Sequence, residues 1–402
     1  MNTHHDELEQ MLGRDLHQQV DGMSTVPFGF SEVQGRAHRI RRNRRITAGI
    51  ALAAAVAVIV PVGLTVGGTL QSKDEIQPAP SPSVPAEVSR TTLTVNGLPH
   101  GHAPEIEYFT VDGVVLPGEG TQQLPESYQA LVPSSAAGGW IALGPNREEV
   151  IYLSEDFERL GSSPASGYGF ATTPERDYVS WVVPENGVQT LELRSTTDPD
   201  KTTSWELPSS PPAGVVGILG PDSVVYETQS RSGTTVGLAT PEGLTIELPY
   251  LNALGVDPVN GLISVQTSST DNTGCFAVIK AATLAPAWET CDYKLGSFSP
   301  DGAYVMATAA DSDGLGPTMV SMLDSRTGDL VAEFASAGRK QVTLIRPAWE
   351  SGSTIIATAI EGTTTTMVRM WVDGALEEVA DPVDASEYGD VPYYVGDNRA
   401  SL

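Results

Sequence analysis

The sequence predicts an all-β protein, and three observations favour a β-propeller among the all-β folds. From about Thr91 onward, short runs rich in Val, Ile, Thr and Tyr alternate with clusters of Gly, Pro, Asn and Asp, which is the pattern of short strands separated by turns. No helical stretch of ten residues interrupts this pattern. The strands also recur in groups of four with a period of roughly 40 to 45 residues, which is the size of one propeller blade.

The repeat is clearest in Leu295–Ala335, where four strands are separated by a turn at 299–302, a loop and the turn "DSRTG". The same order can be followed in five other places. The six units start near Tyr128, Tyr168, Ala213, Ala253, Lys294 and Gln341, at spacings of 40, 45, 40, 41 and 47 residues.

Two remnants outside these units predict how the ring closes. Glu105–Gly120 has the pattern of the outer two strands of another blade, and the tail "DVPYYVGDNRAS" can supply an inner strand. A blade shared between the two ends of the chain would remove the open sheet edges that favour aggregation. Seven blades are therefore favoured, with six and eight as alternatives.

The stretch "FSPDGAYVMAT" (Phe298–Thr308) resembles the repeat of the TolB-like, WD40-like propeller family, which carries an F-S-P-D-G-x-x-[ILV] turn between the first two strands of a blade. The match is partial at Leu219–Tyr226 and at Val256–Val265. The resemblance implies the propeller architecture for the region after Thr91. The layout of the N-terminal part is similar to that of single-pass surface proteins of high-GC bacteria.

The residues of this motif are expected to be structural. Pro300 and Asp301 would occupy the centre of a tight turn, where an Asp side chain can accept hydrogen bonds from backbone N–H groups. Gly302 would supply a positive φ. Asp301 is therefore expected to shape the turn and not to act in catalysis.

A transmembrane helix is predicted for residues 46–68, "ITAGIALAAAVAVIVPVGLTVGG". No charged residue occurs from Ile46 to Ser72, and about 20 apolar residues suffice to cross a bilayer. A cleaved signal peptide is the alternative, but the long N-terminal segment that precedes the apolar run makes it a poor fit. A block of arginines before the span predicts a cytoplasmic N-terminus. These are Arg36, Arg39, Arg41, Arg42, Arg44 and Arg45.

Four regions follow from this topology: a cytoplasmic tail (1–45), the span (46–68), a Pro/Ser-rich linker (69–90) and an extracytoplasmic domain (91–402). Within the tail, residues 6–21 predict an amphipathic helix, because Leu8, Met11, Leu12, Leu16 and Val20 form one apolar stripe. This helix is expected either to dock a cytoplasmic partner or to lie on the inner leaflet.

The charge is distributed unevenly along the chain. The whole chain has a net charge of -27, while residues 1–45 hold seven Arg and six acids, a net of +1. The remainder therefore holds 16 basic and 44 acidic residues, a net of -28. Such acidity repels phosphate backbones, so no nucleic-acid partner is expected.

Residue types that support catalysis are scarce in the predicted domain. Only His100 and His102 of the six histidines lie after the span, in a stretch expected to be a solvated loop. A metal there would need a third ligand that the sequence does not indicate. No phosphate-binding loop, dinucleotide fingerprint or nucleophile elbow occurs. We therefore expect no catalytic residue, no cofactor and no metal.

The two cysteines, Cys275 and Cys291, are expected on the third and fourth strands of one blade. In an oxidising compartment such a pair favours a disulfide, with two buried free thiols as the alternative.

The function expected from these features is that of a binding or scaffold module at the cell membrane, not an enzyme. Its extracytoplasmic propeller would bind a protein or a cell-envelope glycan. One alternative is a transmembrane regulator whose 6–21 helix docks a partner, in the manner of an anti-sigma factor. The other is an extracytoplasmic hydrolase or lyase with acidic residues in the propeller funnel.

Overall fold

The computed structural model describes most of the chain from residue 88 onward. The described ranges are 88–110, 113–166, 169–231, 233–270, 273–312, 316–337, 341–384 and 393–395. The chain divides into two compact units, Met1–Ser81 and Pro82–Leu402. The predicted tail helix, arginine block, transmembrane span and most of the linker lie outside the described residues. Within the ranges given, no helix is long and apolar enough to cross a membrane.

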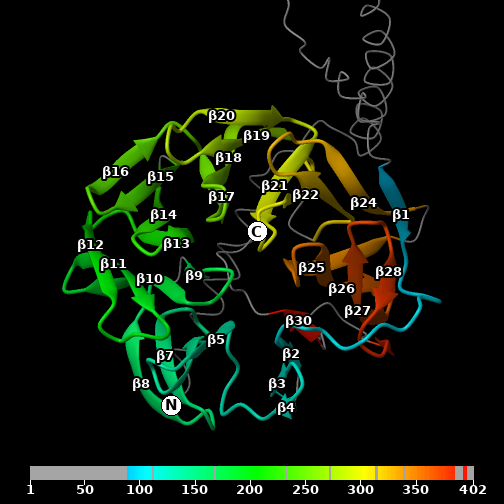
Figure 1. Cartoon of the computed structure of the whole chain (residues 1–402), viewed down its shortest axis with the longest axis horizontal. Helices are drawn as coiled ribbons and strands as arrows, with labels where there is room; N and C mark the ends of the chain where they lie inside the picture. Colours follow the sequence, from blue (N-terminus) through cyan, green and yellow to red (C-terminus); the bar gives the residue numbers. More distant parts are fainter. Residues whose placement is uncertain are drawn as a thin grey trace, which may run out of the picture. The chain divides into compact units, whose positions relative to one another are not determined.

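The second unit is a seven-bladed β-propeller, in which seven sheets surround a common axis (Figure 1). Blades are numbered here in ring order, and their strands are given from the axis outward. Blade 1 holds β30 (Tyr393–Val395), β2 (Tyr108–Thr110), β3 (Gly113–Leu116) and β4 (Gly120–Gln122); blade 2 holds β5 (Ala130–Ser134), β6 (Gly139–Leu143), β7 (Glu149–Ser154) and β8 (Arg159–Pro164). Blade 3 holds β9 (Phe170–Thr172), β10 (Tyr178–Glu185), β11 (Val188–Ser195) and β12 (Thr202–Leu207); blade 4 holds β13 (Ala213–Gly220), β14 (Ser223–Ser230), β15 (Gly233–Thr240) and β16 (Gly243–Leu248).

The remaining three blades complete the ring. Blade 5 holds β17 (Asn252–Asp257), β18 (Leu262–Thr270), β19 (Thr273–Lys280) and β20 (Pro286–Thr290). Blade 6 holds β21 (Tyr293–Phe298), β22 (Tyr304–Ala309), β23 (Met319–Asp324) and β24 (Leu330–Ser336), with β1 (Ser89–Leu93) as a fifth strand. Blade 7 holds β25 (Val342–Trp349), β26 (Thr354–Glu361), β27 (Thr364–Trp371) and β28 (Leu376–Glu378), and β29 (Val383–Asp384) also pairs with β27.

The predicted fold and blade count are confirmed. The inner strands of blades 2 to 7 begin within two residues of the six predicted starting points. The shared blade also has the predicted form, because β30 from the C-terminal tail is its inner strand. One detail differs: the N-terminal remnant supplies three strands to this blade instead of two.

The strand β1 is a feature that the sequence did not predict. It pairs in parallel with the outer edge of β24, from Ser89 opposite Ala332 to Leu93 opposite Ser336. The end of the expected linker, Ser89 and Arg90, thus belongs to the propeller. A parallel outer strand lacks a hairpin connection, so no local turn signal marks it.

Seven apolar clusters hold the described part of the ring together, one between each pair of adjacent blades. Both faces of each blade are therefore buried, which explains the near-continuous apolar runs in inner strands such as β13. Tryptophans reinforce these interfaces from outer strands. The indole N–H of Trp205 donates to the carbonyl of Thr240 at 2.9 Å, and that of Trp288 donates to Ser325 at 2.9 Å. Each of these bonds joins a blade to the next one in the ring.

Candidate binding face

The turns of the blades present an acidic surface on one side of the ring. Each blade repeats the same meander, so the turn after its first strand and the turn after its third strand lie on the same side, which we call the first-turn face. Three first turns carry an exposed acid, namely Asp177, Asp222 and Asp301, whereas the side chains of Asp257 and Glu350, in two other first turns, are buried. Exposed acids of the third turns are Glu119, Glu155, Asp156, Glu158, Asp200, Glu242, Asp329 and Asp373. Among the described residues, the exposed basic residues in or next to these third turns are Arg159, Lys201, Lys280 and Arg326.

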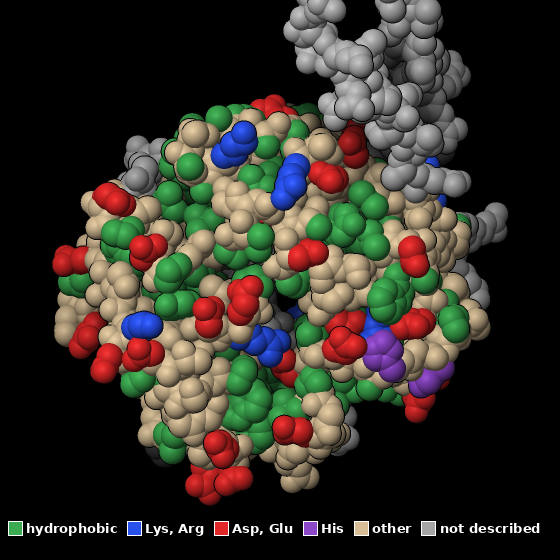
Figure 2. All heavy atoms as spheres, in the orientation of Figure 1, with side chains coloured by type: hydrophobic (Ala, Val, Ile, Leu, Met, Phe, Trp, Pro, Cys, Tyr) green, Lys and Arg blue, Asp and Glu red, His purple; other side chains and the backbone are tan. Residues whose placement is uncertain are grey.

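Space-filling representation shows how these charges appear at the surface. Acidic side chains are spread over the visible side of the ring, and several gather around a central opening together with a few basic ones (Figure 2). A surface of this composition attracts cationic groups and repels anionic ones.

Several first-turn acids shape their own turns. The Asp257 carboxylate accepts the N–H groups of Val259 at 2.8 Å and Asn260 at 3.1 Å. In the next blade, Asp301 accepts the Ser299 hydroxyl at 2.6 Å and the Ala303 N–H at 3.1 Å. The structure thus places Asp301 in the turn-forming position that the sequence predicts.

The first turns of neighbouring blades are also tied to one another. Gly302 has φ +69°, and its carbonyl accepts the Asn260 side-chain amide at 3.0 Å and the Ser325 hydroxyl at 2.6 Å. The Arg326 guanidinium donates to the Asn260 side-chain oxygen at 2.9 Å. These bonds fix the first-turn face across blades 5 and 6, so its charges are held on a rigid frame. Pro300, which precedes Asp301, lies in the same turn.

An ion pair connects blade 3 to blade 1 at this face. Arg176, in the first turn of blade 3, lies 2.6 Å from a carboxylate oxygen of Glu107, which precedes β2. Glu107 is 4% exposed, and the backbone of Arg176 adopts φ +60°. Blade 2 lies between these two blades in the ring, and residues 135–138 of its first turn are small (SAAG). It therefore stabilises the blade that both chain ends share.

A second arginine holds the same blade from blade 7, its neighbour in the ring. The Arg346 guanidinium, on β25, lies 4.8 Å from the centroid of the Tyr394 ring on β30 and donates to the side-chain oxygen of Gln129 at 3.2 Å. Arg346 also has a positive φ, +47°. Three consecutive blades, 7, 1 and 2, are linked through this one side chain.

The segment Ser89–Glu105, which we call the strap, runs along the outer edges of blades 6 and 7 before the chain enters blade 1. At its end lies Arg369 on β27, which is fully buried. This guanidinium donates to both carboxylate oxygens of Glu350 and, at 2.7 Å, to Glu377. It also donates to two strap carbonyls, those of His102 at 3.1 Å and Ala103 at 3.3 Å.

The two histidines lie on this strap, and each ring faces a carboxylate. His100 Nδ1 is 3.4 Å from Glu378, and His102 Nε2 is 3.2 Å from Glu105. The rings are largely exposed, as expected for a loop, but the backbone is fixed by a bridge between His100 and Glu378. Within the described residues, no group of three His, Cys, Asp or Glu side chains is arranged to hold a metal ion.

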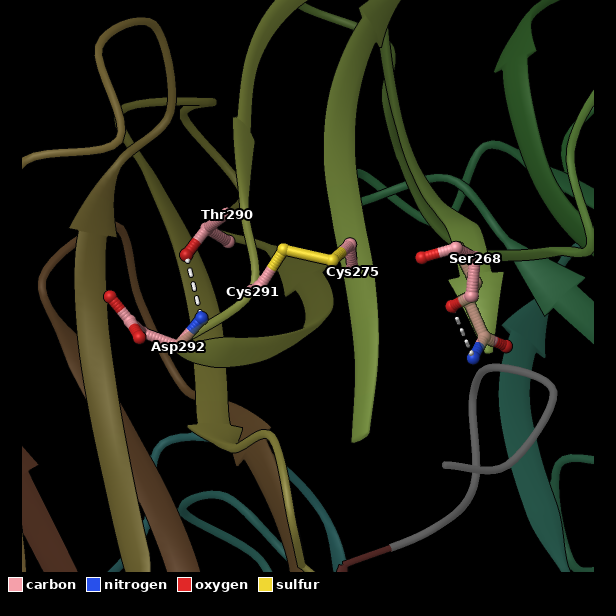
Figure 3. Close-up of a disulfide and its surroundings, with 6 residues drawn as sticks. Ser268, Cys275, Thr290, Cys291 and Asp292 are labelled. Carbon is pink, nitrogen blue, oxygen red and sulfur yellow. Dashed lines mark hydrogen bonds between the residues drawn. A yellow bond between two sulfur atoms is a disulfide. The ribbon is translucent and has the colours of Figure 1, made fainter. Parts of the chain in front are cut away.

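Cys275 and Cys291 form a disulfide, with their Cα atoms 4.1 Å apart. Cys275 lies on β19, while Cys291 directly follows β20 instead of lying within it. Figure 3 shows Cys291 between Thr290 and Asp292, where the Asp292 N–H donates to the Thr290 hydroxyl at 3.2 Å. The bridge therefore fixes the outer edge of blade 5 at the point where the chain crosses to blade 6.

The carboxyl of Glu227 on β14 has a raised pKa. Burial raises the pKa of its carboxyl to about 7, although the Ala253 N–H, donated at 2.6 Å, acts in the opposite direction. Because Ala253 lies on β17, this contact joins blades 4 and 5.

Sequence reasoning missed the strap and its arginine. One signal was present: Arg369 stands in "TTTMVRMW", an otherwise uncharged strand. A charge at such a position implies a buried partner. The arginines from Arg36 to Arg45, which are predicted to set the membrane topology, lie outside the described residues.

No family model and no curated protein matches this chain. Solved structures that resemble it include propellers. The Dos1 propeller is 13% identical, with a TM-score of 0.45, over 67% of this chain and 75% of that one. A putative TolB from Agrobacterium tumefaciens is 11% identical, with a TM-score of 0.37, over 59% and 91%. Kluyveromyces lactis Hsv2 is 14% identical, with a TM-score of 0.40, over 61% and 74%. At these identities the likeness concerns the fold.

Proposed function

We propose that this chain is a single-pass membrane protein, with its N-terminus in the cytoplasm, whose extracytoplasmic propeller is a non-enzymatic binding module. The uncharged segment 46–68 and the arginines before it support the topology. A propeller supports many functions, so the binding role rests on the site and not on the fold.

The observation that carries the proposal is the acidic first-turn face on a rigid frame. Its exposed acids greatly outnumber the exposed bases of the same turns, and hydrogen bonds between turns hold the frame. Such a surface selects a ligand with clustered positive charge. Of the two ligand classes expected from the sequence, a protein with an exposed Lys/Arg-rich segment suits this face better than a neutral glycan.

The test measures binding of two probes to the full chain in detergent: a labelled Lys/Arg-rich peptide and a neutral oligosaccharide. One variant reverses charges on the first-turn face (Glu119→Lys, Glu155→Lys, Asp156→Lys and Asp200→Lys). Its matched control reverses four exposed acids of the opposite face (Glu148→Lys, Glu185→Lys, Asp292→Lys and Asp311→Lys).

We expect the peptide to bind the parent chain and the control within about threefold of each other, and the first-turn variant at least tenfold more weakly, since several charge contacts are reversed. Equal losses in the two variants would indicate attraction by net charge alone and would exclude a specific face. Binding of the oligosaccharide alone would overturn the choice of a protein ligand.

A further inference from the structure

We infer that the strap is the segment whose contacts keep the propeller folded when force is applied through the chain that precedes it. The inference rests on the proposed membrane anchorage, because a tethered domain is pulled at its N-terminal end. Backbone pairing, buried apolar side chains and a buried charge cluster each attach the strap to blades 6 and 7.

The backbone pairing is suited to a pull on the N-terminal end. Five residues of β1 pair in register with β24. The Ser89 hydroxyl donates to the Asp373 carbonyl at 2.9 Å, and that of Thr91 donates to Gly374 at 2.6 Å. Both acceptors lie in the third turn of blade 7, so Ser89 lies at the first-turn face. A pull away from this face runs along β1 and loads all of its backbone hydrogen bonds together.

The middle of the strap is part of the core between blades 6 and 7. Leu93 is 3% exposed and Val95 is 1% exposed, and both belong to the apolar cluster that joins these blades. Burying these apolar side chains stabilises the attached strap. The Glu361 carboxylate accepts the Val95 N–H at 3.3 Å and the Asn96 amide at 3.1 Å. The strap therefore fills the outer end of this interface.

The Arg369 cluster fixes the far end of the strap. Arg369 and Glu350 have side chains only 0% and 2% exposed, and two of the arginine's partners are the strap carbonyls of His102 and Ala103. The N–H of Glu105 donates to Glu350 at 2.7 Å. Detaching the strap would leave buried charged groups without these partners, which is costly.

Among the described residues, the C-terminal end of the propeller is attached over a shorter segment. The C-terminal strand β30 pairs with β2 over only three residues, from Tyr393 to Val395. Its further contacts include those made by the Tyr394 ring, by the Tyr393 carbonyl, which accepts the Thr358 hydroxyl at 2.7 Å, and by Val395, which is 3% exposed. We therefore expect the strap to resist a higher force than β30.

The test pulls the full chain in detergent in two geometries in an optical trap. Both use a handle at Val188→Cys, an exposed position in blade 3, combined with a tag at either the N-terminus or the C-terminus. The strap bears the load in the first geometry, and β30 bears it in the second. We expect the first rupture of the propeller to need at least twice the force in the first geometry. Rupture at an equal or lower force there would overturn it.

Two variants test the contacts themselves. Arg369→Leu removes the hydrogen bonds from this side chain to the strap carbonyls and to its two glutamates. Gly101→Ala changes only a strap residue, but its Cβ would lie inside contact distance of the Glu377 carboxylate, which must shift away from it. Each should lower the force in the N-terminal geometry by at least a third and leave the C-terminal geometry unchanged. The control Gly220→Ala, whose Cβ would meet nothing within 4 Å, should alter neither.

If neither strap variant changes the force, the contacts of the strap do not keep the propeller folded under force. Because terminal tags replace the membrane and no ligand is present, such a failure is distinct from failure of the proposed topology or of ligand binding.

Discussion

The Arg346 guanidinium lies 4.8 Å from the centroid of the Tyr394 ring, so the inner strand of blade 7 holds the C-terminal strand that closes the ring. The Tyr394 ring also stacks on Phe109, 5.1 Å between centroids, and its hydroxyl donates to the Tyr128 carbonyl at 3.3 Å. Blade 1 has strands of only three or four residues. Its stability therefore depends on such side-chain contacts more than that of the other blades.

Truncation of this tyrosine tests that dependence. Tyr394→Ala should lower the free energy of unfolding by about 3 kcal/mol, because ring stacking and apolar burial are lost together. Tyr394→Phe keeps the ring and should cost less than about 1 kcal/mol. Urea unfolding measures both values. Equal losses in the two variants would show that the hydroxyl, and not the ring, holds the strand.

The disulfide should contribute to stability and should be detectable by mass. Replacing both Cys275 and Cys291 by serine should lower the free energy of unfolding by about 3 kcal/mol, as expected for a closed loop of this length. The mass of the protein purified without reductant should increase by two hydrogens on reduction. An unchanged mass would show that the thiols are free.

The first turn of blade 6 should tolerate no side chain at its glycine. Gly302→Ala should cost about 2 to 4 kcal/mol, because a Cβ would lie inside contact distance of Asn260 and Asp257 in addition to the strain of φ +69°. Gly261 offers a matched control: it has φ +63°, but a Cβ there would meet nothing within 4 Å. Gly261→Ala should cost only about 1 kcal/mol. Similar costs at both sites would argue against the tie between the turns.

Glu227 should make stability fall as the pH rises. Its pKa is about 7 in the folded chain against an ordinary value of 4.5. The folded state thus binds the proton more tightly, and this contribution is fully present below about pH 4.5 and is lost as the pH rises through 7. Glu227→Gln keeps an acceptor for the Ala253 N–H without the charge.

This variant should be more stable than the parent at pH 8, by an amount on the order of 2 kcal/mol, and nearly equal to it at pH 5. Urea unfolding at the two pH values measures the difference, with the exposed Glu185→Gln as the control. An advantage that is the same at both pH values would contradict the assignment.

The repeated blades were predictable because each carries its own local signals. Turn residues such as Pro300–Gly302 and the alternation of strands and turns place the inner strands to within two residues. The shared blade was also predictable, since the unpaired segments at both ends had strand patterns.

Contacts between distant segments were not predictable. The pairing of β1 with β24 joins residues more than 240 positions apart, and no local pattern encodes such a partner. Nothing in the local sequence distinguishes Glu350 and Glu377 from surface acids, whereas the structure places both beside Arg369. The acidic character of the first-turn face arises in the same way, because it depends on which turns share one side of the ring.

Labelling of intact cells with a membrane-impermeant maleimide tests whether the propeller lies outside the cell and the N-terminus in the cytoplasm. The probes are single cysteines introduced at Val259→Cys, which is 57% exposed in a turn of blade 5, and at His17→Cys in the tail. We expect Val259→Cys to be labelled on intact cells and His17→Cys to be labelled only after permeabilisation. Labelling of His17→Cys on intact cells, with Val259→Cys protected, would contradict it.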